Sequence, residues 1–409
     1  MRIAMVTRQY WPAVGGVERV VENLGHAYVL RGHQVTVVAQ CVDELHFGRM
    51  THVIRERKIF DAFTHHGMSV VQFRPSRARR SLLLPLAAEL IPFGGRITRH
   101  WLGRYSSAYY AAVVDPVLTP LLRGADVVHM LGSNLLAVGA VRSAHRLGLP
   151  VAISPFAHVG EWGDDSGSVS AYLNAEKLLA TTRADADAYR SLGVPEARIE
   201  IVGLPVPDAV AGLDELSGEP HGEPMAPAPP APVILFLGQR RPTKRHELLL
   251  AAAELVWERH PDAHFAFVGP GRPLPSERDP RILDVGRVSD QARGWWLQRA
   301  EVLSLPSVSE SFGMVVAEAW SQSLPVLVSD IPVLRELVEV SGGGIASAPD
   351  RESFADAICS LLDDRERCRQ MGRAGYEYWA RELTPDAVAA RHLAIYRRLI
   401  EERRASASP

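Results

Sequence analysis

Two glutamates eight residues apart interrupt a mostly apolar stretch of this chain. The stretch is SESFGMVVAEAW, residues 309–320, and the glutamates are Glu310 and Glu318. A strand predicted to end near Leu305 makes the next residues a strand-to-helix loop, with the helix beginning around Gly313. Glu310 would then lie in the loop and Glu318 on the second helical turn. Both carboxylates are suited to accept hydrogen bonds from hydroxyl groups, and sugar hydroxyls fit that description.

The backbone between these glutamates offers a place for an anion. Four amides would be the unpaired donors of the helix's first turn, those of Phe312, Gly313, Met314 and Val315. Such donors form a ready phosphate site, and a glycine among them allows close approach. The structural alternative is that Glu310 merely favours the positive end of the helix and that Glu318 is an exposed helix residue.

A basic loop follows another predicted strand upstream. In FLGQRRPTKRHE, Gly238 ends the strand, and Arg240, Arg241, Lys244 and Arg245 crowd the loop after it. Basic side chains at the carboxyl end of a strand can hold a diphosphate and neutralise charge on a leaving group. Only three of the 45 basic residues are lysines, which suggests that position 244 requires the compact charge of an ammonium group. The alternative is a solvated basic turn.

A diglycine loop near the start of the chain is a weaker signal. In QYWPAVGGVERVVENL, Gly15 and Gly16 form a tight loop before a predicted helix. The segment lacks the GxGxxG pattern, so the fingerprint of a nicotinamide cofactor is missing. A glycine loop can still approach a phosphate or an acceptor, although a simple turn is the common alternative.

The elements that must position these residues alternate between strands and helices. RIAMVT, GVERVVENLGHAYVLRG and QVTVVAQ predict a βαβ unit with parallel strands within about forty residues. Residues 217–232 carry six prolines and predict a linker, after which the pattern restarts at VILFLG. We therefore expect an α/β protein with two doubly wound Rossmann-like domains facing a central cleft, residues 1–216 and 233–384. Ligands of such folds bind at the carboxyl ends of the strands.

Composition excludes several classes of protein. With 45 basic and 47 acidic residues, the chain gives no signal for a nucleic-acid partner. The cysteines Cys41, Cys359 and Cys368 are scattered, which argues against a disulfide framework or a cysteine zinc site and favours a reducing cytosol. The N-terminal MRIAMVT predicts a strand rather than a signal peptide, and the most apolar window, residues 81–93, is too short and interrupted to span a membrane.

Taken in order, seven segments resemble the retaining glycosyltransferases of family 4, which have the GT-B architecture. The segments span nearly the whole chain: PAVGGVERVV, DVVHM, SPFAHVGEW, RADADAYRSLGVPEARIEIVGLPV, FLGQRRPTK, FVGPGRP and ESFGMVVAE. The resemblance implies a nucleotide-diphospho-sugar donor of UDP or GDP type, held mainly by the C-terminal domain. It also implies an acceptor held mainly by the N-terminal domain, transfer with retention at the anomeric carbon, and a helix at about 385–409 that crosses back to that domain.

The same resemblance assigns roles to single residues. It implies that Glu310 contacts hydroxyls of the transferred sugar and that Glu318 contacts the ribose. The amides of residues 312–315 would line the sugar and phosphate site, and Lys244 with a nearby arginine would grip the diphosphate. His158 would lie near the donor sugar, whereas without the resemblance a hydrogen-bonded histidine near a strand end is the simpler interpretation.

One position departs from the family pattern. Where the family commonly has arginine directly after the strand-ending glycine, this chain has Gln239, followed by Arg240 and Arg241. Either Arg240 takes over the diphosphate contact through a shifted loop or the grip relies on Lys244 alone. We favour Arg240.

No metal is implied, and the protein is expected to work without a cofactor. The DAD sequence at 185–187 mimics the DxD of metal-dependent transferases, but it falls in a helical pattern, and we expect a solvated face. The alternative functions are a sugar-nucleotide epimerase or hydrolase of the same architecture and, less favoured, a non-catalytic sugar-nucleotide-binding protein.

The acceptor is left open between a small molecule, a glycan and a lipid-linked molecule. Residues 74–105 combine arginines with an apolar stretch. They could lie on the inner face of a membrane as a peripheral contact, but an acceptor-side loop and helix packed on the core of a cytoplasmic enzyme is favoured. The nucleotide base, the sugar and the oligomeric state are not specified by these patterns.

Overall fold

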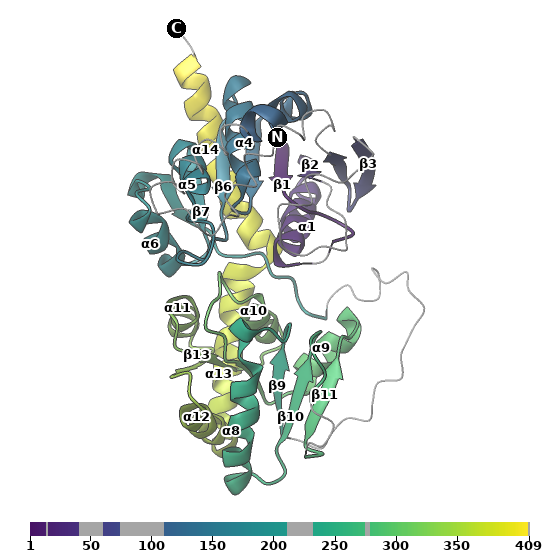
Figure 1. Ribbon diagram of the computed structural model, residues 1–409, viewed down its shortest axis with the longest axis vertical. Helices are drawn as coiled ribbons and strands as arrows, with labels where there is room; N and C mark the ends of the chain where they lie inside the picture. Colours follow the sequence, from purple (N-terminus) through teal and green to yellow (C-terminus); the bar gives the residue numbers. More distant parts are fainter. Residues whose placement is uncertain (14, 41–59, 74–109, 211–231, 275–278, 408–409) are drawn as a thin grey trace, which may run out of the picture. The chain divides into compact units, whose positions relative to one another are not determined.

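The computed structural model describes residues 1–13, 15–40, 60–73, 110–210, 232–274 and 279–407. The chain divides into two compact units (Figure 1). One comprises Met1–Pro205 together with Val388–Pro409, and the other comprises Val206–Ala387. The division falls before the proline-rich stretch, of which residue 232 alone is described, and the segment at 74–105 lies outside the described residues.

The first unit is built on a mostly parallel sheet. Its strand order is β3-β4-β2-β1-β5-β6-β7-β8 among the described residues, and the β3–β4 pair is antiparallel. The strands are β1 (Arg2–Thr7), β2 (Gln34–Gln40), β3 (Phe60–His65), β4 (Met68–Phe73), β5 (Val127–Leu131), β6 (Val151–Ser154), β7 (Lys177–Ala180) and β8 (Ile199–Ile201). The helices are α1 (Gly16–Leu30), α4 (Leu135–Arg146), α5 (Ser166–Asn174), α6 (Arg183–Ser191), α14 (Pro385–Ala407) and a helical stretch at 110–122.

The predicted βαβ unit at the start of the chain is present. β1 pairs in parallel with β2 from Arg2 opposite Gln34, and α1 connects them. β1 and β5, which pair inside this sheet, are buried along almost their whole length because helices cover both faces. Apolar side chains such as Val6, Met130 and Ile153 fill the core between sheet and helices.

A buried polar cluster fixes the C-terminal helix α14 to this unit. The Tyr396 hydroxyl lies 2.7 Å from His129 Nδ1 on β5 and 3.0 Å from the Tyr28 hydroxyl on α1. The Tyr28 hydroxyl lies 3.0 Å from His392 Nδ1, one helical turn before Tyr396. All four side chains are fully or almost fully buried. Helix α14 thus closes the unit through hydrogen bonds between segments more than 200 residues apart.

The two histidines of this cluster make stability depend on pH. Burial lowers the pKa of His129 to about 3, and burial, followed by the charges of His129 and Arg391, lowers the pKa of His392 well below its ordinary value. His392 Nε2 has no hydrogen-bond partner among the described residues. Because unfolded histidine binds a proton below about pH 6.5, acid favours the unfolded chain in this range.

We therefore expect these histidines to have no effect on the free energy of unfolding above about pH 7. Below about pH 6.5, each of them should lower this free energy by about 1.4 kcal/mol per pH unit. Urea unfolding between about pH 7 and about pH 5 measures this slope. His392→Asn keeps a polar group near Nδ1 and should lower the slope by about 1.4 kcal/mol per pH unit, the contribution of one histidine. An identical slope in wild type and variant would contradict the assignment.

The second unit holds a parallel sheet with the order β11-β10-β9-β12-β13-β14. Its strands are β9 (Val233–Leu237), β10 (His264–Val268), β11 (Ile282–Gly286), β12 (Val302–Leu305), β13 (Val326–Ser329) and β14 (Gly344–Ser347). Its helices are α8 (His246–Arg259), α9 (Asp290–Arg299), α10 (Met314–Ser321), α11 (Pro332–Ser341), α12 (Arg351–Asp363) and α13 (Arg365–Tyr378), with a π-helical turn at Trp379–Leu383. The prediction of two doubly wound α/β units is confirmed.

Each sheet changes winding direction at its first strand. In the second unit the chain runs from β9 outward to β11, returns to β12 on the other side of β9, and continues to β14. The point between β9 and β12 is therefore a topological switch point, where loops diverge and leave a crevice for ligands. In the first unit the equivalent point lies between β1 and β5.

The prediction of a solvated face for the DAD sequence is wrong for Asp185. This residue is buried on α6, where its carboxylate accepts hydrogen bonds from the backbone amide (2.8 Å) and the hydroxyl (3.1 Å) of Thr181. Asp187 is exposed and pairs with Arg190 on the same helix. The first aspartate thus satisfies polar groups at the end of β7, which a helical pattern does not reveal.

Cys359 and Cys368 are buried free thiols, and Cys41 lies outside the described residues. In the part of the chain that the structure describes, no helix has the length and apolar character needed to cross a membrane.

Candidate functional site

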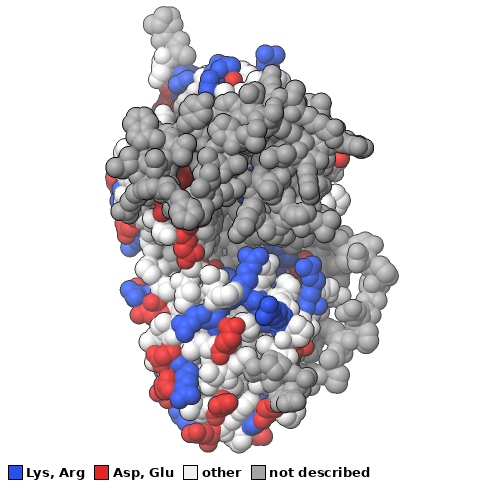
Figure 2. All heavy atoms as spheres, viewed as in Figure 1, with Lys and Arg blue, Asp and Glu red and all other residues white. Residues whose placement is uncertain are grey.

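The two loops singled out in the sequence leave the second sheet side by side. β9 ends at Leu237 and leads into the basic loop 238–245, and β12 ends at Leu305 and leads into the loop 306–313. These strands pair directly, with Leu235 opposite Leu303. The Val308 amide donates a 2.9 Å hydrogen bond to the Thr243 carbonyl, which joins the loops. Basic side chains gather near the end of this unit toward which β9 points (Figures 1 and 2).

An ion pair joins the two loops through their most distinctive residues. Lys244 Nζ donates to Glu310 Oε1, and the two side chains are 27% and 9% exposed. The ammonium group is therefore partly open to solvent, whereas the carboxylate is almost covered. An anionic ligand that reached this point could take over the ammonium and release the carboxylate to accept a hydroxyl donor.

The helix after the second loop begins as the sequence predicts. Gly313 is the N-cap of α10 and has a φ of 88°, a left-handed conformation that glycine adopts without strain. A Cβ at this position would also lie 2.9 Å from Leu334 Cδ2. The Val316 amide donates to the Gly313 carbonyl at 2.9 Å, so the amides of Met314 and Val315 precede the first bonded turn. Phe312 and Gly313 are buried, and Met314 and Val315 are half-buried.

The second glutamate is held inside the unit by an arginine that the sequence did not single out. Glu318 on α10 is 5% exposed and accepts a hydrogen bond from Arg293 on α9. The alternative that Glu318 is an exposed helix residue is therefore wrong. The Arg293 guanidinium holds the carboxylate in one orientation.

Arg240 lies in a different environment from Lys244. Its guanidinium is 3% exposed, forms an ion pair with Asp284 on β11 at 2.5 Å, and donates to the Gly269 carbonyl at 3.3 Å. Its Nε is buried and has no hydrogen-bond partner among the described residues. Arg241, the next residue, is exposed. Of the two arginines, Arg241 is the one already turned toward solvent.

The remaining candidate residues belong to the first unit. His158 follows β6, stacks on Trp162 at a centroid distance of 4.8 Å, and exchanges backbone hydrogen bonds with it at 3.0 and 2.9 Å. Gly15 caps α1, and Gly16 is its first residue. A Cβ on Gly15 would lie 2.3 Å from Glu18 Oε2, so this glycine makes room for a carboxylate at the helix end. Burial raises the pKa of Glu18.

Three residues of these arrangements were absent from the prediction: Asp284, Arg293 and Glu18. Asp284 and Arg293 are ordinary charged residues on a strand and a helix, outside the quoted segments, whereas Glu18 lies within PAVGGVERVV but was given no role. A search for partners of the buried glutamates among basic residues of neighbouring helices would have included Arg293.

Two family profiles match successive parts of the chain. The profile described as "Glycosyl transferase 4-like domain" matches residues 15–205, and that described as "Glycosyl transferases group 1" matches residues 231–364. The chain belongs to glycosyltransferase family 4. The two matches fall on the two structural units, and the second includes both loops at the switch point.

Curated relatives of this family 4 member include two bacterial glycosyltransferases. The chain is 28% identical over 324 residues to the D-inositol 3-phosphate glycosyltransferase 2 of Catenulispora acidiphila, covering 75% of this chain and 65% of the relative. It is 24% identical over 317 residues to the alpha-D-kanosaminyltransferase of Streptomyces kanamyceticus, covering 75% and 78%. The match thus spans slightly less than two thirds of the first relative's length.

The fold of the family 4 chain also matches a solved structure. Anabaena HepE in complex with UDP-glucose superposes with a TM-score of 0.66 at 15% identity, covering 97% of this chain and all of HepE. At this identity the match establishes the fold, and it confirms the predicted GT-B architecture.

Proposed function

We propose that this protein transfers a sugar from a nucleotide-diphospho-sugar to an acceptor that is a small molecule, a glycan or a lipid-linked molecule, with retention at the anomeric carbon. The observation that carries the proposal is the pair of glutamates at the switch point, each held by a cation, on either side of the start of α10. Relatives named as glycosyltransferases and the UDP-glucose complex of HepE support a nucleotide-sugar donor, with UDP favoured over GDP.

Donor binding would break the Lys244–Glu310 ion pair and leave the Arg293–Glu318 pair intact. The diphosphate binds the Lys244 ammonium and the amides at the start of α10, because both offer hydrogen-bond donors to an anion. Glu310, released from Lys244, accepts hydroxyls of the sugar. Glu318 stays fixed by Arg293 and accepts the ribose hydroxyls. The ion pair at Lys244 thus keeps the empty site neutral until the diphosphate enters.

The chemical step depends mainly on stabilisation of the leaving diphosphate. As the glycosidic bond to phosphate breaks, negative charge grows on the phosphate oxygen, and Lys244 with the α10 amides lies ready to stabilise it. The leaving phosphate helps to remove the acceptor's proton on the same face of the sugar, which gives retention. None of these steps assigns a covalent nucleophile to the protein.

The remaining predicted residues keep the roles that the resemblance implies. Residues 1–216 would hold the acceptor, with Gly15 and Gly16 near it and His158 near the donor sugar, and residues 233–384 would hold the donor. Arg240 contacts the diphosphate only if it leaves Asp284, so the exposed Arg241 becomes the competing candidate. Arg240→Ala and Arg241→Ala, compared for the KM of the donor, separate the two. The proposal also includes a lipid-linked acceptor, with residues 74–105 as the predicted contact with the membrane surface.

No metal takes part in this proposal, because Lys244 and the helix amides supply the positive charge. Treatment with a chelator is therefore expected to leave the rate of transfer unchanged, measured as nucleotide diphosphate released from the donor in the presence of acceptor. The treated enzyme is assayed well below its melting temperature. A loss of rate that manganese restores would contradict this account.

The experiment that tests the function combines donors and acceptors. Purified protein is incubated with UDP-sugars and GDP-sugars, with and without inositol phosphates and aminocyclitols, and the released diphosphate and the products are measured. The proposal predicts release that depends on the acceptor and a product that keeps the anomeric configuration in its NMR spectrum. Release or an altered sugar in the absence of acceptor would instead indicate a hydrolase or an epimerase.

A further inference from the structure

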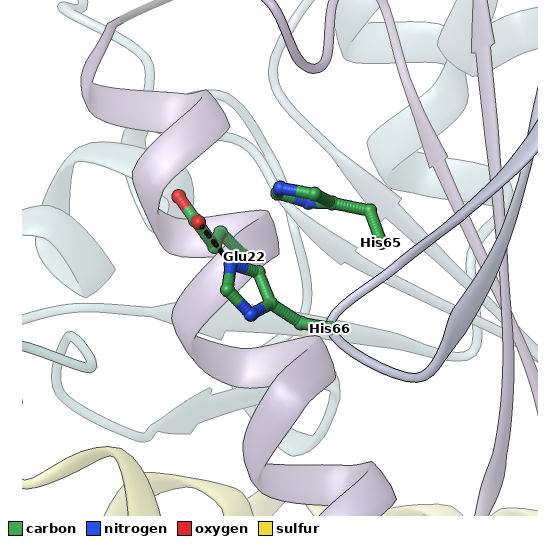
Figure 3. Close-up of side chains that lie close together, drawn as sticks. All are labelled: Glu22, His65 and His66. Atoms are coloured by element: carbon green, nitrogen blue, oxygen red, sulfur yellow. Dashed lines mark ion pairs between the residues drawn. The ribbon is translucent and has the colours of Figure 1, made fainter. Parts of the chain in front are cut away.

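Two histidines and a glutamate meet in the first unit, and none of the three is among the residues assigned above. Glu22 comes from α1, His65 is the last residue of β3, and His66 is the first residue of the turn between β3 and β4 (Figure 3). One ligand atom from each lies within 4.8 Å of the others, and all three residues are half-buried. His66 Nε2 lies 2.9 Å from Glu22 Oε1. Imidazole nitrogens and a carboxylate oxygen form a common ligand set for transition metals.

The backbone of the turn is what brings the two imidazoles together. Successive side chains of a strand point to opposite faces, so neighbouring histidines would normally diverge. Here His66 and Gly67 have φ values of 49° and 75°, the left-handed pair typical of a two-residue hairpin turn. The rings of His65 and His66 consequently lie 4.2 Å apart between centroids. Histidine in this conformation is uncommon, and such conformations cluster at functional sites.

The His65 imidazole has an outer partner of the kind found in metal sites. His65 Nδ1 lies 2.8 Å from the Tyr10 hydroxyl, which leaves Nε2 as the nitrogen available to an ion. Metal-binding histidines generally use their second nitrogen in this way, which fixes ring orientation and tautomer. The ring of His26 packs edge-on against the His66 ring at 5.3 Å, and its Nδ1 lies 3.3 Å from the backbone carbonyl of His66.

We propose that Glu22, His65 and His66 bind one divalent transition-metal ion of the zinc type, with water completing the coordination. Ligands bound at about 2.0–2.2 Å lie roughly 3.5 Å apart in a tetrahedron, so small side-chain rotations convert the cluster into a site. Two nitrogens and one oxygen favour zinc, nickel or copper over magnesium or calcium. The ion would pin the β3–β4 hairpin to α1.

This role is structural and independent of the proposed sugar transfer. All the ligands belong to the first unit, whereas the groups proposed to act on the diphosphate belong to the second. Removal of the ion should therefore lower the melting temperature without changing the transfer rate at low temperature. Failure of the metal proposal and failure of the transferase proposal can be told apart, because metal binding is measured without any sugar.

The test uses the full chain without an affinity tag, freed of metal with a chelator. Titration with Co²⁺, followed by its visible absorption, and with Zn²⁺, followed by calorimetry, should show one saturable site, and Zn²⁺ should raise the melting temperature. His66→Asn is the first variant, because asparagine tolerates the left-handed turn. Glu22→Gln is the second, and it leaves the hairpin sequence intact. Each should lower the affinity at least tenfold.

The matched control is His145→Gln. His145 also pairs with a glutamate, Glu176, at 3.1 Å, but among the described residues no second histidine joins that pair to make a possible metal site. This variant should bind the metal as wild type does. Absence of a stoichiometric site in wild type, or equal affinity in wild type and Glu22→Gln, would overturn the proposal, and Glu22→Gln decides the matter if His66→Asn does not fold.

Discussion

Replacing Lys244 with alanine is expected to lower the turnover number for sugar transfer about a hundredfold, or about 3 kcal/mol of transition-state stabilisation. The Lys244 ammonium lies in the loop after β9 and is partly exposed. It pairs with Glu310, which lies in the loop after β12. A charge aimed at the leaving diphosphate contributes most as the bond breaks, so the turnover number should fall more than donor affinity. The measurement is the initial rate at saturating donor.

Two further variants make the result specific. Lys244→Arg keeps the charge and should retain more of the rate than alanine does, because arginine also binds phosphate. Lys177→Ala removes another lysine that pairs with a carboxylate, Glu200 at 2.9 Å, and should transfer sugar as wild type does. Turnover of Lys244→Ala at the wild-type rate, in a folded protein, would remove this residue from the mechanism.

The second large effect is expected at Glu318. Alanine there leaves the mostly buried Arg293 guanidinium with the more distant Asp290 carboxylate at 3.9 Å in place of Glu318, and breaking a buried pair costs up to about 3–5 kcal/mol of unfolding free energy. The same change removes the proposed acceptor for the ribose hydroxyls, so donor affinity should fall at least tenfold. Urea unfolding and donor titration measure the two losses separately.

A double variant distinguishes the two causes. In Arg293→Ala combined with Glu318→Ala, neither charge is left alone, so part of the lost stability should return. Donor affinity should stay low, because the carboxylate is still missing. If the double variant bound the donor as wild type does, Glu318 would be a structural partner of Arg293 and would have no part in nucleotide binding.

The sequence predicts the parts of the site that depend on local patterns. The end of β9, the loop carrying Lys244, the cap at Gly313 and the place of Glu318 on α10 all follow from strand, turn and helix signals within a few residues. Order along the chain also predicts the two parallel sheets, because alternating strands and helices leave few other topologies.

The partners of these residues could not be predicted in the same way. Arg293 meets Glu318 and Asp284 meets Arg240 because helices and strands distant in the sequence pack together, and no local pattern reports such contacts. Asp185 is buried because its carboxylate accepts hydrogen bonds from Thr181, directly after β7. The hairpin that presents His65 and His66 escaped prediction, because its turn is His-Gly rather than the usual Asn-Gly or Asp-Gly.

The central claim is that a nucleotide diphosphate binds at the Lys244 loop and the start of α10. Calorimetric titration of the wild-type protein with UDP and UMP, and with GDP and GMP, tests it most directly. The account predicts saturable binding of one diphosphate per chain, at least tenfold tighter than the matching monophosphate, because the second phosphate adds a charged hydrogen bond. Equal affinity for monophosphate and diphosphate, or no binding of any of the four, would contradict it.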